Sequence, residues 1–242
     1  MKSVNRGLFV TLFLLMNLPA LAAQKTIHLT FDDGPLNGTA NILQVLAKEQ
    51  VPVAMFIVGM HPDLNQHRAA LVAKAKSMPL VTHANNHYRY FYASVEDLLA
   101  DLARTDKSLG LKGPPIYARL PGRNVFRLPD MSSDDFSIGK PEGRRKEPGF
   151  EFVAASGYYL YGWDHEWVYD DRGKPVQKVG HLVSEIDHLF AYGKLAKPDK
   201  LILLMHDEMF QDNYNGTANP QALVDTLKKR GYAFGNISSF DG

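Results

Sequence analysis

The stretch Thr30-Phe31-Asp32-Asp33-Gly34-Pro35 places two adjacent carboxylates after an apolar run and directly before a turn. Neighbouring residues of a strand point to opposite faces, so a regular strand cannot aim both side chains at one substrate. We therefore expect the strand to end here and Gly34-Pro35 to turn the chain. One carboxylate could then bind a metal ion while the other moves a proton. The alternative is an ordinary strand end with two solvated aspartates.

Two histidines stand four positions apart in a later segment, Val81-Thr82-His83-Ala84-Asn85-Asn86-His87. Imidazole is a common nitrogen ligand for zinc, and this spacing lets both rings reach one ion from a single turn or tight loop. Two histidines and one aspartate make a three-ligand set with an open position for water, which is typical of a catalytic site. Two unrelated surface histidines are the alternative.

The order of these motifs resembles the polysaccharide deacetylases of the NodB-homology type, which form carbohydrate esterase family 4. Three later segments continue the resemblance, and they are Arg119-Leu120-Pro121-Gly122, Trp163-Asp164-His165-Glu166-Trp167 and Leu201-Ile202-Leu203-Leu204-Met205-His206. They are similar to the family's Arg-x-Pro-aromatic motif, its Asp-Trp motif and its late Leu-x-x-x-His strand end. The matches therefore extend from Thr30 to His206.

The resemblance implies that Asp33, His83 and His87 bind a divalent metal ion. A carboxylate with two imidazoles suits Zn²⁺ best, although Co²⁺, Ni²⁺ or Fe²⁺ could fit the same ligands. Such an ion would polarise an acetamide carbonyl and lower the pKa of its bound water towards about 7.

The resemblance also assigns acid–base chemistry to two residues. Asp32 would deprotonate the water, held in place by a bidentate pair with Arg119, and His206 would protonate the leaving amine. A carboxylate near His206 would favour its protonated form. Glu166 and Asp164 both lie close enough in sequence to do this, and we leave the choice between them open.

The expected substrate contacts lie beside these groups. Trp167 would form an apolar wall for the acetyl methyl group, with Trp163 as the alternative wall or as a core residue. Backbone N–H groups near Gly122, after Pro121, could stabilise the oxyanion. The chain departs from the family pattern at Ala84, at Gly122-Arg123 and at Glu166, which bears on the substrate groove rather than on the reaction type.

Composition bounds the class of protein. The chain has 242 residues, 45% of them hydrophobic, which suits one domain with a full core. A formal net charge of +1 gives no sign of a nucleic-acid partner. The chain has no cysteine, so its stability cannot depend on disulfides.

The N-terminus is typical of a secretory signal peptide over residues 1–22. Lys2 and Arg6 precede an apolar run, and Ala20-Leu21-Ala22 supplies a small-x-small cleavage pattern. We expect cleavage after Ala22, with Ala23 as the close alternative, leaving a catalytic domain over 23–242 in the periplasm or outside the cell. The run falls short of the about twenty residues that span a bilayer, so we expect no stable membrane anchor after cleavage.

Strand-like runs alternate with helical spacing along the rest of the chain, which predicts a single-domain α/β fold with a parallel sheet. Strands are expected over 26–31, 53–58, 80–82, 116–119, 158–163, 201–205 and 232–234, and helices over 41–50, 64–77, 94–109, 150–156, 181–190 and 218–230. Residues 126–149 lack periodicity and are expected to be a loop insertion, either a substrate rim or a tolerated surface loop. Periodicity alone fits a barrel or an open doubly wound sheet; the resemblance implies a distorted, incomplete (β/α) barrel, often of seven strands.

The sequence thus predicts a metal-dependent hydrolase that removes N-acetyl groups from an acetylated glycan of N-acetylhexosamines, its expected partner. Hydrolysis of another amide or ester, such as a cyclic imide or O-acetylated xylan, is one alternative. A non-catalytic glycan-binding protein of the same fold is the other. The particular glycan, the metal in the cell and the oligomeric state are left open.

Overall fold

The computed structural model describes residues 23–59, 66–78, 81–85, 94–135 and 149–241, and for 81–85 it describes the backbone alone. The predicted signal peptide lies outside these residues. Among the helices within them, none is both long enough and apolar enough to cross a membrane.

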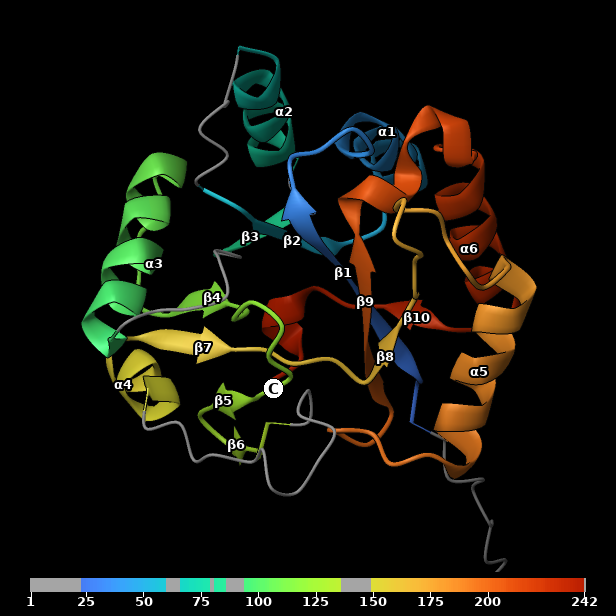
Figure 1. Ribbon diagram of the computed structural model, residues 1–242. Helices are drawn as coiled ribbons and strands as arrows, with labels where there is room; N and C mark the ends of the chain where they lie inside the picture. The colour runs from blue at the N-terminus through green and yellow to red at the C-terminus, as the bar shows by residue number, and fades with distance from the viewer. Residues whose placement is uncertain (1–22, 60–65, 79–80, 86–93, 136–148, 242) are drawn as a thin grey trace, which may run out of the picture.

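A twisted sheet occupies the centre of the molecule (Figure 1). Its strands are β1 (Thr26–Gly34), β2 (Val53–Ile57), β3 (Val81–Asn85), β4 (Ile116–Ala118), β5 (Arg127–Leu128), β6 (Met131–Ser132), β7 (Tyr158–Leu160), β8 (His165–Glu166), β9 (Lys200–His206) and β10 (Ala233–Phe234). The order is β6-β5-β7-β4-β3-β2-β1-β9-β8, and β10 adds to β1. All neighbours from β7 to β8 are parallel, whereas β5 is antiparallel to β6 and β7.

The two ends of this path, β6 and β8, form no ladder with each other within the described residues, so the sheet curves without closing. Seven parallel strands in an open path confirm the predicted incomplete barrel. Parallel strands place their carboxyl ends at one edge of the sheet, where ligands of such folds bind.

Helices surround the sheet on its outer side (Figure 1). They are α1 (Thr39–Glu49), α2 (Gln66–Ser77), α3 (Val95–Leu109), α4 (Gly149–Ala155), α5 (Val179–Tyr192) and α6 (Ala218–Lys229), with short 3₁₀ helices η2 (Asp207–Phe210), η3 (Asp212–Tyr214) and η4 (Ile237–Ser239). These positions confirm the six predicted helices to within a few residues.

Alternate strand positions supply two separate cores. Leu29, Phe31 and Met205 belong to the large cluster that also contains apolar residues of α1, α5 and α6. The intervening positions of β2 and β9, such as Phe56 and Ile202, belong to a second cluster on the other face of the sheet. This alternation follows from the two-residue period of a strand, and it places each strand residue on a defined face.

The prediction that the first strand ends before the aspartates is wrong in one respect. β1 continues to Gly34, because the chain absorbs an extra residue instead of stopping: Asp33 has a left-handed φ of 69°, and the register with β2 shifts between Asp32 and Gly34. Such a bulge turns one side chain away from the regular alternation. Asp33 is therefore the extra residue of the bulge, while Asp32 keeps its place in the ladder with β2.

The predicted insertion at 126–149 is partly ordered into secondary structure. β5 and β6 form a short hairpin at its start, and Arg127 of β5 also pairs with Leu160 of β7. Two-residue strands carry too little pattern for periodicity to find them. The remainder, 136–148, lies outside the described residues.

Candidate active site

One pocket collects most of the residues that the sequence singled out. It lies at the carboxyl end of the parallel strands and has a volume of about 180 Å³. Its ionisable side chains are those of Asp32, Asp33, Arg119, Glu166 and His206. They come from β1, β8, β9 and the residue after β4, which are distant in sequence and adjacent in the sheet.

Asp32 and Arg119 form a buried ion pair in this pocket. An Arg119 terminal nitrogen (Nη1) lies 2.8 Å from the Asp32 carboxylate, and both side chains are almost wholly buried. The same nitrogen donates to the Thr30 hydroxyl, and the other guanidinium nitrogens donate to the carbonyls of Tyr161 and Gly162. The predicted bidentate pair is therefore corrected to a single contact, because the rest of the guanidinium is committed to neighbouring oxygens.

His206 lies beside Asp32 across the sheet. The two residues are register partners in the parallel β1–β9 ladder, which places their side chains on the same face. The ring of Tyr169 packs on the imidazole with 4.7 Å between ring centroids. The Nδ1 atom of His206 is buried and has no hydrogen-bond partner among the described residues.

Glu166 is the carboxylate that accompanies His206 in the pocket. Burial raises the pKa of Glu166, an effect that the charge of His206 opposes and that of Asp32 reinforces. A carboxyl group with a raised pKa next to an imidazole and a second carboxylate is a common arrangement for proton transfer.

Asp164 has a different role in the structure. One of its carboxylate oxygens accepts a hydrogen bond from the Ala196 N–H at 2.7 Å, and the other accepts one from the Ile202 N–H at 2.8 Å. Asp164 thus ties the start of β8 to β9 and does not line the pocket. Of the two carboxylates left open by the sequence, the geometry favours Glu166.

The predicted tryptophan wall is also corrected. Trp167 is buried in the outer core, where its ring packs edge-on against Phe210 and its indole N–H donates to the Gln177 carbonyl. Trp163, which was the alternative, lines the pocket together with Tyr169. Neighbouring residues of an extended chain point to opposite faces. Because Glu166 points into the pocket, Trp167 points away from it, and Trp163 lines the pocket instead.

The segment after Arg119 forms a tight turn at the mouth of the pocket. The Arg123 N–H donates to the Leu120 carbonyl at 3.0 Å, and Gly122 has a left-handed φ of 61°. Proline followed by glycine is the usual sequence of such a type II turn. Gly122 and Leu120 line the pocket, whereas Pro121 serves the turn and is not among the lining residues.

The three predicted metal ligands are described to different extents. Asp33 lines the pocket next to Asp32. His83 belongs to β3, where its backbone pairs with Met55 of β2, and His87 lies outside the described residues. Among the side chains that the structure does describe, no three histidine, aspartate or glutamate residues are grouped to hold a metal ion. The complete ligand set therefore stays a prediction.

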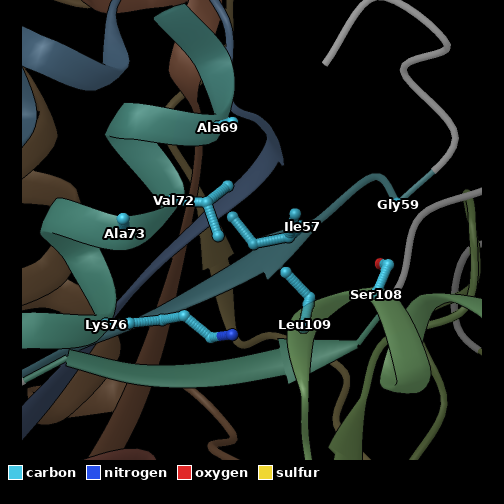
Figure 2. A pocket seen from close by; sticks show the side chains of 8 residues that line it. All are labelled: Ile57, Gly59, Ala69, Val72, Ala73, Lys76, Ser108 and Leu109. Atoms are coloured by element: carbon cyan, nitrogen blue, oxygen red, sulfur yellow. The ribbon is translucent and has the colours of Figure 1, made fainter. Parts of the chain in front are cut away.

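A second pocket, of about 240 Å³, lies between α2 and α3 beside the end of β2. Figure 2 shows Ile57, Val72 and Leu109 converging in it, with Lys76 at one side. Among the described residues of its lining, Lys76 is the one with a charged side chain, so we take the strand-end pocket as the candidate active site.

Sequence reasoning missed two residues of the site region. Tyr169 was not singled out, although an aromatic residue close behind the Asp-Trp-like motif was a usable signal. Asp207 follows His206 directly and is fully buried. An acidic residue at the end of so apolar a strand was the sequence feature that could have identified it.

An open (β/α) barrel with acid and base side chains at its strand ends is the arrangement of an α/β enzyme. The sequence model of the family described as polysaccharide deacetylase matches residues 21–127. This match covers less than half of the chain, and over those residues the chain is similar to the polysaccharide deacetylase family.

Known proteins show the same relationship. The chain is 23% identical to a chitin disaccharide deacetylase of Vibrio alginolyticus, over 89% of this chain and 71% of the relative. It is 36% identical to a bifunctional xylanase/deacetylase of Pseudobutyrivibrio xylanivorans, over 89% of this chain and 30% of that longer protein. Among solved structures, a carbohydrate esterase family 4 esterase of Streptococcus mutans has a TM-score of 0.61 at 21% identity, over 88% of this chain and 86% of that one. This last likeness is one of fold.

Proposed function

We propose that the protein hydrolyses N-acetyl groups on an N-acetylhexosamine-containing polysaccharide or oligosaccharide and releases acetate. The observation that supports this most directly is the set of three groups in one pocket: Asp32 held by Arg119, His206 in register with it, and Glu166 beside them. Amide hydrolysis needs a base for the water and an acid for the amine, and this set offers both.

The proposed roles follow from the contacts of each group. Asp32, held by its contact with Arg119, takes a proton from the attacking water. His206 gives a proton to the amide nitrogen as the C–N bond breaks, so that the sugar leaves as an amine and the acyl group as acetate. Glu166 stabilises the protonated imidazole, and Tyr169 holds its ring in place.

A divalent ion, most favourably Zn²⁺, is part of the proposal, with Asp33, His83 and His87 as its ligands. When bound, it would polarise the acetyl carbonyl and acidify the water. The support for this set is the donor chemistry of its residues, one carboxylate and two imidazoles, together with the position of Asp33 in the pocket lining.

The walls of the pocket suit an acetamido group. Trp163, Tyr169 and Leu204 provide apolar surface, and Gly122 leaves the backbone open at the mouth. A volume of about 180 Å³ equals that of about six water molecules, which leaves the sugar ring at the mouth rather than inside.

Acetate release tests the proposal. The purified protein with Zn²⁺ would be incubated with chitin oligosaccharides, peptidoglycan and O-acetylated xylan, beside the variants Asp32→Asn and Asp212→Asn. Asp212 is a matched control, because it binds Asn41 on the exposed side of α1. We expect the parent and Asp212→Asn to release acetate and Asp32→Asn to lose at least about 100-fold in rate. Full activity of Asp32→Asn would refute the assignment of the base.

The xylan arm addresses one alternative, ester hydrolysis, which the name of the xylanase/deacetylase relative favours. Acetate from O-acetylated xylan alone would replace the N-acetyl proposal with that one. A metal-free protein that binds glycans and releases no acetate would favour the non-catalytic alternative.

The location of the enzyme is part of the same proposal. A signal peptide over residues 1–22 would deliver the domain of 23–242 to the periplasm or the exterior, where acetylated glycans are found. N-terminal sequencing of the mature protein should start at Ala23 or Gln24. An intact Met1 on the functional protein would contradict secretion by cleavage.

A further inference from the structure

Asp207 is a buried acid that the proposed reaction does not use. Its side chain is fully buried between β9 and η2, and no ion pair within the described residues includes it. Burying a carboxyl group without a cation is costly, and burial raises the pKa of Asp207 to about 7. We therefore looked for hydrogen bonds of the Asp207 carboxyl group that could offset the cost of burying it.

The carboxyl group holds the loop that connects β1 to α1. The Thr39 hydroxyl donates a hydrogen bond to one oxygen of Asp207. The Thr39 oxygen in turn accepts from the Leu36 N–H at 2.8 Å, and the Thr39 N–H donates to the Leu36 carbonyl at 3.3 Å. The loop over residues 34–39 is thus linked to Asp207 through the Thr39 hydroxyl and also through the backbone of Leu36, whose hydrogen bond lowers the pKa of Asp207 against the effect of burial.

Two glycines show how closely this loop fits around Asp207. A Cβ atom at Gly34 would overlap the Asp207 carboxylate, and a Cβ atom at Gly38 would overlap the Asp207 backbone carbonyl. Glycine is the residue that permits such an approach of backbone to a neighbouring group. Both ends of the loop, at Gly34 and at Gly38, therefore pack directly against Asp207.

Asp207 also lies close to two groups of the candidate site, namely His206 and the pair of Asp32 and Asp33. His206 precedes it directly, and the loop that it holds begins directly after Asp32 and Asp33. Asp33 has a left-handed φ of 69°, a conformation that a residue other than glycine keeps only when its surroundings impose it.

We propose that Asp207 is a positioning residue that holds the 34–39 loop against the end of β9 and thereby fixes Asp33 relative to His206. The inference deepens the proposed function and rests on it for its kinetic consequences. The hydrogen bonds themselves exist whatever the substrate is, so the loop can be examined separately from activity.

The test compares Asp207→Ala with Asp207→Asn and Thr39→Val with Thr39→Ser. Alanine and valine remove the Asp207–Thr39 hydrogen bond, whereas asparagine keeps an acceptor oxygen and serine keeps the hydroxyl. Asp212→Ala is the matched control, since Asp212 links η3 to Asn41 of α1 without touching the loop. If Asp207→Ala fails to fold, Thr39→Val carries the test.

We expect Asp207→Ala and Thr39→Val to lower kcat by about 10- to 100-fold with KM within about twofold, because an error of about 1 Å in the site costs that much. Asp207→Asn and Thr39→Ser should restore most of kcat. A role in stability alone would instead lower the active fraction without a change in kcat per folded molecule, and unchanged kcat in both pairs would overturn the proposal.

Hydrogen–deuterium exchange supplies the readout that does not depend on the reaction. Peptides covering 33–40 should exchange at least about tenfold faster in Asp207→Ala and Thr39→Val than in the parent or Asp212→Ala. Unchanged exchange there would overturn the proposal even in an active enzyme. A parent without any acetate release would refute the proposed function, while exchange would still decide whether Asp207 holds the loop.

Discussion

At the scale of single residues, the guanidinium of Arg119 organises the floor of the site. It is buried against the face of the Phe56 ring, 4.2 Å from the centroid, and its nitrogens meet one carboxylate, one hydroxyl and two carbonyls. A planar fork of donors can satisfy all four oxygens, whereas the compact ammonium of lysine cannot. The pair with Asp32 is therefore one part of a larger fixed arrangement.

Arg119→Lys should lower the free energy of unfolding by about 2–4 kcal/mol, because buried carbonyls of Tyr161 and Gly162 would lose their donors. Urea denaturation measures this loss. The control is Arg230→Lys, which alters an exposed ion pair with Asp187 and should change stability by less than about 0.5 kcal/mol. Equal effects of the two substitutions would contradict the proposed role of the fork.

His28 should make stability depend on pH. Burial lowers the pKa of His28 to about 4, against a weaker opposing effect of the hydrogen bond to the Asn236 carbonyl. The unfolded chain therefore binds a proton near pH 6.5 that the folded protein rejects. The resulting stability is complete above about pH 6.5 and is lost as the pH falls towards 4.

The loss through His28 should reach about 2 kcal/mol at pH 5 relative to pH 7.5. Urea denaturation of the parent and His28→Asn at both pH values measures it as a difference between the two proteins. His188→Asn, on the exposed side of α5, is the control and should behave like the parent. A parent and His28→Asn with the same pH dependence would rule out this contribution.

Several residues that the sequence singled out lie together in the structure, whereas their catalytic roles stay predictions. Asp32, Arg119, Glu166 and His206 meet in one pocket, since motifs at the ends of parallel strands converge. The tryptophan wall could not be predicted, because Trp163 and Trp167 differ only in which face their backbone presents. That choice depends on where β8 begins, and a strand of two residues leaves no periodicity to read.

At the scale of elements, most helices and long strands were predictable and their irregularities were not. The bulge at Asp33 depends on the register between β1 and β2, which is a property of two segments together. The start of α3, in contrast, was predictable from local chemistry. Ser94, at the start of the predicted helix 94–109, accepts a hydrogen bond from the Asp97 N–H at 3.1 Å and caps the helix.

Ser94→Ala should therefore lower the free energy of unfolding by about 1 kcal/mol, the usual contribution of an N-cap. Ser108→Ala in the last turn of the same helix is the matched control, because the Ser108 hydroxyl donates to the Thr105 carbonyl and caps no free N–H. Thermal unfolding of the two variants compares them. A loss from Ser108→Ala as large as that from Ser94→Ala would show that the cap is not responsible.

At the scale of the whole molecule, the inner side of the open barrel is filled from the last part of the described chain. Phe240 is fully buried, with its ring stacked on Phe126 at 5.9 Å and edge-on to Tyr161 and His28. Nothing in the alternating pattern of strands and helices predicts that a segment after the last helix fills this space. Packing on the inner side of the barrel therefore depends on contacts between residues that are distant in sequence.

Phe240→Ala should cost about 3–5 kcal/mol of unfolding free energy, the usual loss for a buried phenylalanine. Phe152→Ala is the control, because Phe152 is 59% exposed on α4 and should cost less than about 1 kcal/mol. Urea denaturation distinguishes them. A small loss from Phe240→Ala would mean that its ring does not belong to the core.

The position of β1 has a consequence for how the protein is made. This strand is the first among the described residues, yet the Thr30 hydroxyl donates a hydrogen bond to the Leu203 carbonyl, 173 positions later. The edge of β1 that pairs with β9 stays unpaired until that segment has been made. A nascent chain emerging from the ribosome therefore presents an unpaired, apolar strand edge for most of its synthesis. Such edges promote association between chains, so efficient production should depend on chaperones that shield this strand until translation has passed β9.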